Sequence, residues 1–520
     1  MLRRLLDSRW FYFALAALLF AIGLASMVEI RTPDRPTGSV ADIARLKERK
    51  DLNVVFLLID TLRADRLSSY GYHRPTSPIL DQLAATGIRF SRVTAQSSWT
   101  KTSMTSLWTA TYPVSHGVLR SQHGIPPEAT LPAEIFRDAG YRTAGIYRNG
   151  WVAPNFGFEQ GFEVYIRPVP SNTPERMTRR TASSLKLSGS DEDIFEGAKE
   201  FLQGVRNERF FLYLHYMDVH QYVYSDVNFG PSFSDAYDSA IHWVDRNVGA
   251  LVTTLQDLGL ADRTILVIAA DHGEGFREHE IEGHARTLYT EVIDTPLIIA
   301  LPFHLREGIV VEERVENIDI WPTVLEMLGL APLPGAQGVS LLPAIEAAAN
   351  GPKLPAGELR NWGGRTHFAQ LDRTWGTPDA EPRNLVAVTD GPWRFFSFAH
   401  NRERVELYDH RTDPGEKNDL SASHREVVDS LQSKLSEYLD LPGVTWGQPV
   451  EVQLDRLRLE QLRALGYEVG APEDQGNPAM KPLPKGGLGR GAEKPDASPP
   501  SGQESGEEPG GSPGPAAASP

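Results

Sequence analysis

The segment Thr264–Glu274, T-I-L-V-I-A-A-D-H-G-E, decides the fold of this 520-residue chain. Its short apolar, β-branched run predicts a buried parallel strand that ends in an acid, an imidazole and a glycine. The segment Asn53–Ile59, N-V-V-F-L-L-I, has the same character and is also followed by an acid, Asp60. Because open α/β sheets carry their chemistry at the carboxyl ends of the strands, we expect Asp60, Asp271 and His272 to meet at one sheet edge.

Those three side chains form a reasonable ligand set for one divalent metal ion. Two carboxylates and an imidazole leave coordination positions open for a substrate oxyanion. The alternative is that acids at strand ends only cap the turns that follow. Two matched strand ends, with a histidine beside the second, favour the metal site.

Strand and helix signals alternate along most of the chain. Strands are expected at 141–147 and 210–214, and helices at 77–85, at 193–206 and after Ser234, which would cap a long helix. This βαβα order predicts an α/β fold with a large, mostly parallel sheet sandwiched by helices.

A threonine precedes another expected helix, within W-T-K-T-S-M-T-S-L-W-T-A-T-Y-P. Thr100 stands before Met104, Leu107 and Trp108, which have helical spacing. At a helix N-terminus, the backbone amides and the helix dipole favour negative charge that develops on a hydroxyl. The alternative is that Thr100 is an ordinary N-cap residue.

Histidines gather at two further places. The strand at 210–214 leads into H-Y-M-D-V-H, which puts His215, Asp218 and His220 at a strand edge. The segment after Glu274 contains His284 and Arg286. Its histidine spacing does not fit the H-E-x-x-H pattern of zinc proteases, so we reject that class.

The N-terminus is expected to anchor the protein in a membrane. Residues 1–9 contain three arginines, and residues 10–28 are apolar over about the length that crosses a bilayer. A cleaved signal peptide is the alternative, because Gly23 and Ala25 are small. We expect a single-pass protein of the cell membrane, with a tether at 29–50 and the catalytic domain on the exported side.

Composition excludes several classes of protein. The chain has no cysteine, so disulfides, thiolate metal sites and cysteine nucleophiles are absent. Its formal net charge of -16 argues against a nucleic-acid partner, which would require clustered Lys and Arg. An anionic small substrate remains compatible with a metal and a few local cations.

Several blocks of the chain, in this order, resemble the sulfatase family of the alkaline phosphatase superfamily. The resemblance covers about residues 50–465. The family fold implies a catalytic domain at 51–350 and a smaller C-terminal antiparallel-sheet subdomain with its helix at 351–469. The blocks are N-V-V-F-L-L-I-D-T-L-R-A-D, W-T-K-T-S-M-T-S-L-W-T-A-T-Y-P, F-L-Y-L-H-Y-M-D-V-H, D-H-G-E, G-H-A-R-T-L-Y-T-E-V-I-D-T-P-L-I and L-Y-D-H-R-T-D-P-G-E-K-N-D-L.

The resemblance also implies roles for single residues. Asp60, Asp271 and His272 would bind the metal, and Thr100 would be both a metal ligand and the nucleophile. The metal would be calcium on the sulfatase pattern, or manganese or zinc as in the phosphoryl-transfer branch.

Four other residues would act on the substrate. By similarity, His215 and His284 would hold the oxyanion or protonate the leaving group. Arg286 takes the position of an active-site lysine of many sulfatases, and Arg148 falls near another.

The nucleophile motif departs from the family. Sulfatases have Cys or Ser in a Cys/Ser-x-Pro-x-Arg motif and oxidise it to formylglycine, whereas this chain has Thr100, Thr102 and Met104 at those positions. Threonine cannot become that aldehyde, so no formylglycine is expected, and a direct threonine nucleophile points towards phosphorus chemistry. Thr61 also stands where many sulfatases have another metal-binding Asp.

Three functions remain open. The first is a metal-dependent hydrolase of sulfate or phosphate esters, or a phosphoryl-headgroup transferase of the same superfamily, acting on an anionic glycan, lipid headgroup or small molecule. The second is a non-catalytic sulfatase fold that binds anionic ligands, and the third is a structural envelope protein. A helix is expected at 452–467, followed by a disordered tail rich in Pro, Gly, Ser and Glu at 470–520.

Overall fold

The computed structural model describes most of the predicted soluble region. The described residues are 35–170, 178–179, 189–225, 227–351, 364–374, 381–398 and 404–453. The predicted anchor, the tail and nearly all of the predicted helix at 452–467 lie outside them. Within these ranges, no helix is both long and apolar enough to cross a membrane.

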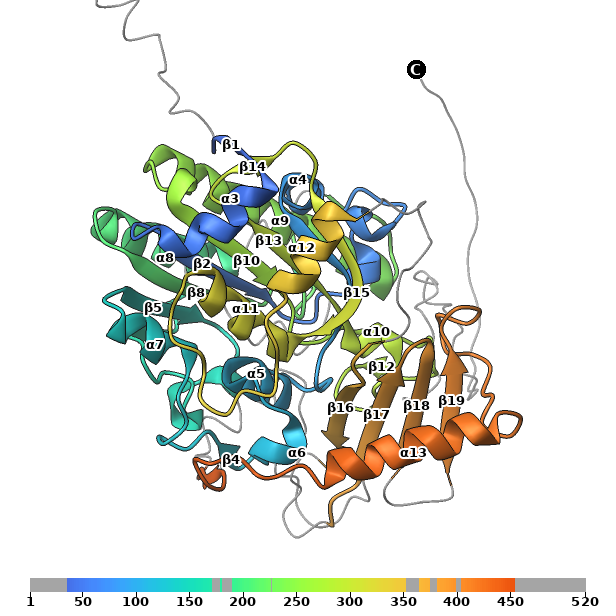
Figure 1. Ribbon diagram of the computed structural model, residues 1–520. Coiled ribbons are helices and arrows are strands. Elements are labelled where there is room, and N and C mark those ends of the chain that lie inside the picture. Colours follow the sequence, from blue (N-terminus) through green and yellow to red (C-terminus); the bar gives the residue numbers. More distant parts are fainter. Residues whose placement is uncertain are drawn as a thin grey trace, which may run out of the picture. The chain divides into compact units, whose positions relative to one another are not determined.

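An eight-stranded sheet forms the centre of the large domain (Figure 1). β13 runs antiparallel to both of its neighbours, and every other pair in the sheet is parallel. The prediction of a large, mostly parallel sheet is therefore confirmed. In spatial order the strands are β15 (Ile309–Glu316), β3 (Ile88–Thr94), β13 (Asp294–Ala300), β10 (Thr264–Ala269), β2 (Asn53–Ile59), β8 (Phe210–Tyr216), β5 (Arg142–Tyr147) and β6 (Val164–Ile166).

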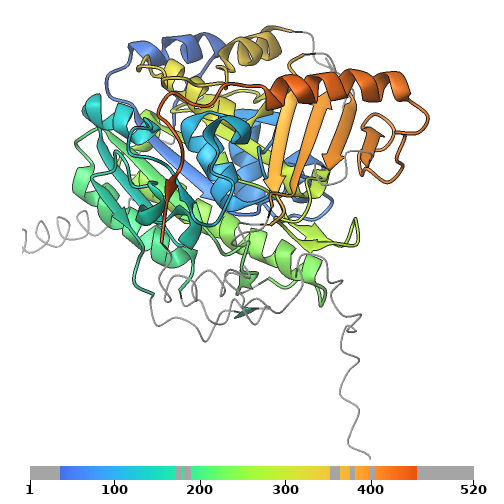
Figure 2. The same ribbon diagram turned by 90° about the horizontal axis from the view of Figure 1, so that it is seen from below.

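Helices cover both faces of this sheet (Figures 1 and 2). Successive residues of a strand point to opposite faces, so Phe56 of β2 packs in one hydrophobic cluster and Leu57 in the other. The cluster with Leu57 includes α4 (Pro78–Thr86), α8 (Asp191–Val205) and α9 (Phe233–Asp257). The cluster with Phe56 includes α3 (Val40–Arg45), α5 (Thr100–Thr109), α7 (Pro132–Asp138), α11 (Ile320–Met327) and α12 (Leu342–Asn350).

A four-stranded antiparallel sheet forms the C-terminal subdomain. Its strands are β16 (His367–Asp372), β17 (Asn384–Asp390), β18 (Trp393–Phe398) and β19 (Val405–Asp409). The helix α13 (Arg425–Leu439) lies along it and buries Leu431 and Leu435 against Val388 and Phe395 (Figure 1). The subdomain is confirmed. The sequence predicts strands at 386–389, 393–398 and 405–408, and β16 is an addition to these three.

The remaining helices and strands are short. They are β1 (Thr37–Gly38), α6 (Pro113–His116), β4 (His123–Gly124), β7 (Thr178–Arg179), β9 (Val223–Tyr224), β11 (Gly275–Phe276), β12 (Glu282–Gly283), α10 (Thr290–Ile293), β14 (His304–Leu305) and β20 (Val450–Glu451).

Two local predictions were wrong. Residues 35–50 are not a free tether, because β1 pairs with β14 and Leu46 is 1% exposed in the core. Ser232, rather than Ser234, caps α9, because its hydroxyl accepts the backbone N–H of Asp235 while the Asp235 carboxylate accepts the Ser232 N–H.

Candidate active site

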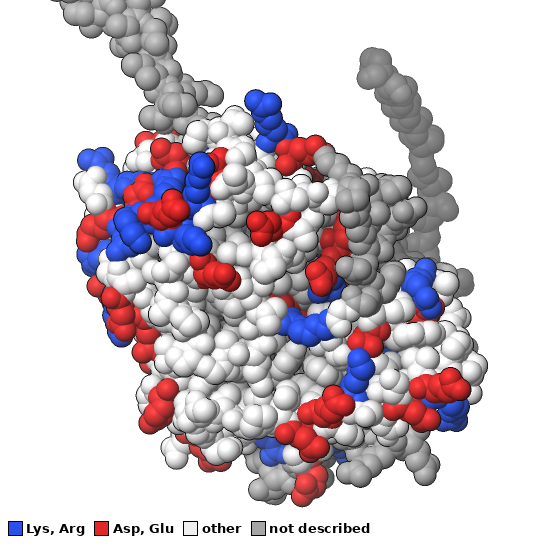
Figure 3. All heavy atoms as spheres, in the orientation of Figure 1, with Lys and Arg blue, Asp and Glu red and all other residues white. Residues whose placement is uncertain are grey.

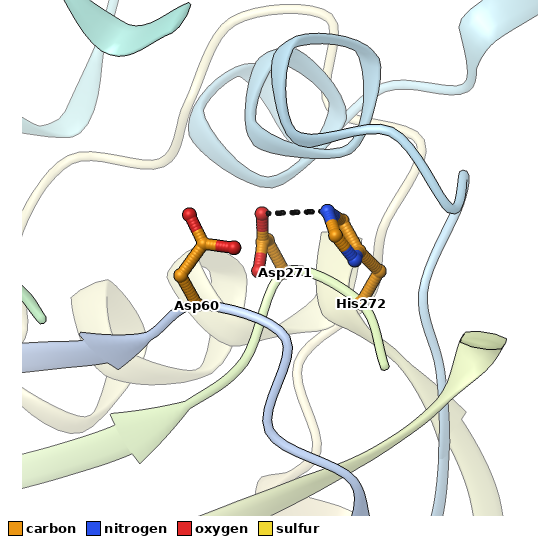
Figure 4. A group of neighbouring side chains, drawn as sticks. All are labelled: Asp60, Asp271 and His272. Atoms are coloured by element: carbon orange, nitrogen blue, oxygen red, sulfur yellow. Dashed lines mark ion pairs between the residues drawn. The ribbon is translucent and has the colours of Figure 1, made fainter. Parts of the chain in front are cut away.

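The parallel strands β2 and β10 bring the three predicted metal ligands together. Leu58 pairs with Ala269, so both strands end at the same edge of the sheet. Asp60, Asp271 and His272 follow there, fully buried, with one ligand atom from each within 4.8 Å of the others. Figure 4 shows the three side chains converging.

The chemistry of this cluster fits a divalent cation. Asp60 Oδ1 and Asp271 Oδ2 are buried and have no hydrogen-bond partner among the described residues. Burial, together with the negative charge of Asp60, raises the pKa of Asp271 to about 7. Two buried carboxylates with unpaired oxygens are unfavourable without a compensating positive charge, and a divalent metal would supply it.

His272 completes the ligand set in the tautomer that metal binding requires. Its Nδ1 lies 3.0 Å from the carbonyl of Gly273, so Nδ1 carries the proton and Nε2 keeps its lone pair. That Nε2 lies 3.3 Å from Asp271 Oδ2 (Figure 4). Burial also lowers the pKa of His272, which keeps the ring neutral.

Thr100 approaches this cluster from a helix that packs on the sheet. It is the first residue of α5, and its Oγ1 lies 3.1 Å from His272 Nε2. The N-cap alternative is wrong, because Trp99 occupies the N-cap position. The fully buried Thr100 hydroxyl therefore lies at a helix N-terminus beside the three metal-ligand candidates.

Two residues hold Asp60 in place. The Nδ2 group of Asn149 donates to Asp60 Oδ2 at 2.6 Å, and His215 Nε2 lies 3.0 Å from the same oxygen. The other ring nitrogen of His215 lies 2.6 Å from the Tyr213 hydroxyl. Both nitrogens of His215 thus have protein partners, so the geometry assigns this residue to positioning Asp60 rather than to the substrate.

Asn149 was not among the predicted site residues. Its signal in the sequence is the R-N-G stretch directly after β5, at the same edge of the parallel sheet. Its amide also lies 3.5 Å from Thr100 Oγ1, so it connects the nucleophile candidate with Asp60.

A second group of side chains borders the cluster. The His284 ring lies 4.6 Å from the His272 ring, and His284 Nδ1 lies 3.3 Å from both carboxylate oxygens of Glu274. Burial lowers the pKa of His284 to about 4 and raises that of Glu274 to about 7. The structure thus places His284 beside the metal-ligand candidates, as the sequence predicts.

His220 also belongs to this group, although the sequence predicts no role for it. Its ring lies 5.0 Å from the His284 ring, and neither of its buried ring nitrogens has a hydrogen-bond partner among the described residues. The sequence feature that could have identified His220 is its position five residues after His215, in the turn that follows β8.

The two predicted arginines have different surroundings. Arg286 is partly buried, and its charge contributes to the lowered pKa of His284. Arg148 is fully engaged elsewhere, because its guanidinium contacts Asp218 at 2.7 Å and Asp191 at 3.3 Å. Those partners are not part of the metal-ligand cluster, so the prediction that Arg148 contacts substrate is not supported by its position.

The family assignment follows from a match over the large domain. The sulfatase family profile matches residues 52–330, more than half of the chain. The chain belongs to the sulfatase family. A second profile, described as "N-sulphoglucosamine sulphohydrolase, C-terminal", matches residues 278–440 of the chain. The profiles thus cover both the sheet that carries the site and the C-terminal subdomain.

A human and a bacterial sulfatase are similar to this protein over most of its length. Human arylsulfatase A is 28% identical over 465 residues, which cover 79% of this chain and 87% of the relative. An N-acetylgalactosamine-6-O-sulfatase of Bacteroides thetaiotaomicron is 23% identical over 492 residues, covering 74% and 92%. These matches identify the protein as a sulfatase-like ester hydrolase.

Solved structures share the fold. A 2-O GAG sulfatase superposes with a TM-score of 0.62 at 17% identity and covers 75% of this chain and 92% of that chain. The phosphonate monoester hydrolase of Agrobacterium radiobacter superposes with a TM-score of 0.59 at 19% identity, covering 78% and 100%. Members of the sulfatase family are metal-dependent, in agreement with the cluster around Asp60.

Proposed function

We propose that this protein is a metal-dependent hydrolase of sulfate or phosphate esters in which Thr100 is the nucleophile. The observation that carries the proposal is the 3.1 Å approach of Thr100 Oγ1 to His272 Nε2, within a cluster of unpaired carboxylate oxygens. Asp60, Asp271 and His272, with Thr100 Oγ1, would hold the metal. When bound, a divalent ion would lower the pKa of a coordinated hydroxyl and stabilise charge on the ester oxygens.

Residues of the protein carry out the bond-making and proton-transfer steps. The Thr100 hydroxyl loses its proton to solvent, and its oxygen forms a bond to sulfur or phosphorus while the bond to the leaving alcohol breaks. The amides at the start of α5 favour the negative charge that develops there. His284 and Glu274 together hold a proton near neutral pH and pass it to the leaving oxygen. A water oxygen then forms a bond to sulfur or phosphorus, the bond to the Thr100 oxygen breaks, and a proton of that water restores the Thr100 hydroxyl.

The donor set favours manganese or zinc over calcium. Calcium prefers six to eight oxygen ligands, whereas this cluster includes an imidazole nitrogen. The residue that replaces a second aspartate, Thr61, uses its hydroxyl to donate to the Asp60 carbonyl at 2.7 Å. Its N–H donates to Asp271 Oδ1 at 3.3 Å. Thr61 therefore orients the ligands and adds no carboxylate.

A sulfated glycan is the substrate class that the relatives favour. Among them are N-acetylgalactosamine-6-sulfatases, and one structural neighbour was solved in complex with D-glucosamine-2-N,6-O-disulfate. A phosphate or phosphonate ester is the second candidate, because a threonine nucleophile needs no formylglycine and a phosphonate monoester hydrolase shares the fold.

A substrate panel tests the chemistry. The full chain, purified in detergent, would be assayed with nitrophenyl sulfate, phosphate monoester and phosphodiester, each with calcium, manganese or zinc. We expect turnover of at least one ester with manganese or zinc. That turnover should be lost in Thr100→Ala and partly retained in Thr100→Ser. Turnover that survives Thr100→Ala would reject the nucleophile.

We also propose that residues 10–28 anchor the protein and that the catalytic domain is exported. At the start of the described chain, Arg35 donates to the Leu301 carbonyl at 3.0 Å. β13 ends beside the start of β10, so this attachment lies at the sheet edge opposite the active site. Six residues, 29–34, span at most about 20 Å. The active site would then face away from the membrane.

The surface near this attachment is compatible with anionic lipid headgroups. Figure 3 shows Lys and Arg gathered with some acids near where the described chain begins. Lys47 and Lys50, early in the described chain, are exposed. The cysteine-free chain allows a clean test of topology. An impermeant maleimide added to intact cells should label Ala422→Cys, at an exposed position, but not Ser8→Cys. The reverse pattern would reject the orientation.

A further inference from the structure

A segment beside the active site is held from two sides. This segment, residues 278–290, is called the rim loop here and carries His284 and Arg286. On the side of the nucleophile, the Ala285 N–H donates to the Ser98 carbonyl at 2.9 Å. The Ser98 hydroxyl donates to the Thr287 carbonyl at 2.6 Å. These bonds join the rim loop to the segment that leads into Thr100.

On its other side the rim loop contacts the C-terminal subdomain, where the Tyr289 hydroxyl donates to Glu406 Oε2 at 2.7 Å and Glu416 makes two hydrogen bonds. Glu416 accepts a hydrogen bond from His279 Nε2 on its backbone carbonyl at 2.8 Å. Its side-chain Oε2 accepts the N–H of Thr290 at 2.8 Å. A single residue therefore contacts both ends of the rim loop. The neighbouring Lys417 ammonium also donates to the Glu278 carbonyl.

Glu416 is itself held firmly. It is 1% exposed, and its Oε1 lies 2.7 Å from His410 Nε2 and 3.3 Å from Arg394 Nη1. Its backbone has a positive φ of 54°, a conformation that is uncommon for residues other than glycine. Such a conformation persists where the surroundings enforce it, and this one aims the carbonyl at His279 and the carboxylate at Thr290.

The subdomain has other attachments to the large domain that do not involve the rim loop. Tyr438 of α13 packs its ring 5.7 Å from that of Tyr112, and the Tyr112 hydroxyl donates to Glu316. The backbone N–H of Val114, in α6 of the large domain, donates to the Tyr438 hydroxyl at 3.4 Å. Loss of the Glu416 contacts would therefore loosen both ends of the rim loop without releasing the subdomain.

We propose that Glu416 is a positioning residue that fixes the rim loop so that His284 stays beside the metal-ligand cluster. The C-terminal subdomain is then part of the catalytic unit, through contacts that reach the edge of the active site. This inference rests on the proposed ester hydrolysis for its kinetic consequence, whereas its structural consequence can be measured separately.

Position 290 offers a matched pair of variants. Thr290 is the first residue of α10, where proline is tolerated in a helix. Thr290→Pro removes the N–H that donates to Glu416, and Thr290→Val keeps that N–H while removing the hydroxyl. We expect Thr290→Pro to lower kcat/KM about tenfold or more and Thr290→Val to lower it less than threefold, estimates that follow from the loss of one charge-assisted hydrogen bond.

Glu416 is tested directly by Glu416→Ala and Glu416→Gln, with Tyr438→Phe as the control. Glu416→Ala should lower kcat/KM as much as Thr290→Pro does. Glu416→Gln keeps an acceptor for the Thr290 N–H, so its kcat/KM should lie between those of Glu416→Ala and the wild type. Calorimetric metal affinity should be unchanged. Tyr438→Phe should lower the melting temperature with kcat/KM retained. Wild-type kinetics in Glu416→Ala, or a loss that follows metal affinity, would overturn the proposal.

Hydrogen exchange separates this proposal from the proposed function. In Glu416→Ala, but not in Tyr438→Phe, amides of residues 278–290 should exchange faster than in the wild type. That result supports the positioning role even if none of the tested esters is turned over. Unchanged exchange in the rim loop would overturn the positioning role even in an active enzyme.

Discussion

Two buried clusters of charged residues lie on either side of the rim loop, and they differ in whether the protein itself neutralises their carboxylates. In the metal-ligand cluster, Asp60 and Asp271 have unpaired oxygens, and the pKa of Asp271 is raised to about 7. In the cluster at the junction with the C-terminal subdomain, Asp294 lies 2.9 Å from Arg394 and 3.1 Å from Arg314. Burial opposes the charge on Asp294, but the two arginines hold its pKa well below its usual range.

The difference separates a binding site from a structural contact. The junction cluster balances its acids with guanidinium groups from the protein, so it needs no ligand. The metal-ligand cluster lacks that balance, and a bound cation would restore it. Burial alone does not distinguish the two, because both clusters consist mainly of buried residues.

The largest expected effect is that of Asp271→Asn. Turnover should fall by about 10³-fold or more, because the nucleophile and the ester oxygens lose their cation. Calorimetry should show little metal binding. The metal-free variant should melt at the same temperature as the metal-free wild type or higher, because the change removes carboxylate repulsion. A large drop in melting temperature would instead give Asp271 a structural role.

The junction cluster should respond to Arg394→Met in stability and not in metal binding. This change leaves Asp294 and Glu416 with less positive charge in a buried environment, which should cost about 3–5 kcal/mol of unfolding free energy. Denaturant unfolding measures the loss. A loss of metal affinity at unchanged stability would show that the two clusters are not separate.

Asn149→Ala should have a smaller effect, confined to the metal-ligand cluster. The amide donates to Asp60 at 2.6 Å, and such orienting bonds typically contribute about 10–100-fold to metal affinity or activity. Metal titration of the variant beside the wild type checks this. Unchanged affinity would mean that His215 alone suffices to orient Asp60.

The smallest expected effect is a change in the pH dependence of stability in Asp294→Asn, which loses its ion pairs near neutral pH and differs less from the wild type in acid. The folded-state pKa of Asp294 is lowered, so its contribution to stability is present above the unfolded pKa of about 4 and is lost as pH falls below it. The wild type should therefore lose up to about 1.4 kcal/mol more per pH unit than the variant there. Parallel pH profiles of unfolding would contradict the ion pair.

The sequence predicts the elements of the sheet well and the direction of side chains poorly. Hydrophobic runs that end in acids were sufficient to place Asp60 and Asp271 at one edge, because parallel strands align their ends. Arg148 follows β5 at the same edge, but its guanidinium turns to Asp191 and Asp218. No local pattern encodes that choice, since Asp218 is 70 residues away.

Other omissions have the same cause. Asn149 and His220 belong to motifs that were visible in the sequence, but their importance depends on contacts across the fold. β16 contains His, Gln and Asp among its six residues, so its apolar pattern is weak, and pairing with β17 stabilises it. Residues 35–50 looked like a linker because their apolar side chains are few, yet Ile43 and Leu46 are both buried.

The most direct test of the nucleophile at the metal-ligand cluster is mass spectrometry of the peptide that contains Thr100. The full chain would be mixed with manganese or zinc and a turned-over ester, then quenched in acid during the first turnover. We predict one sulfuryl or phosphoryl group on Thr100, absent without metal and absent in Asp271→Asn. Product release with Thr100 unmodified, or the group on another residue, would contradict the account.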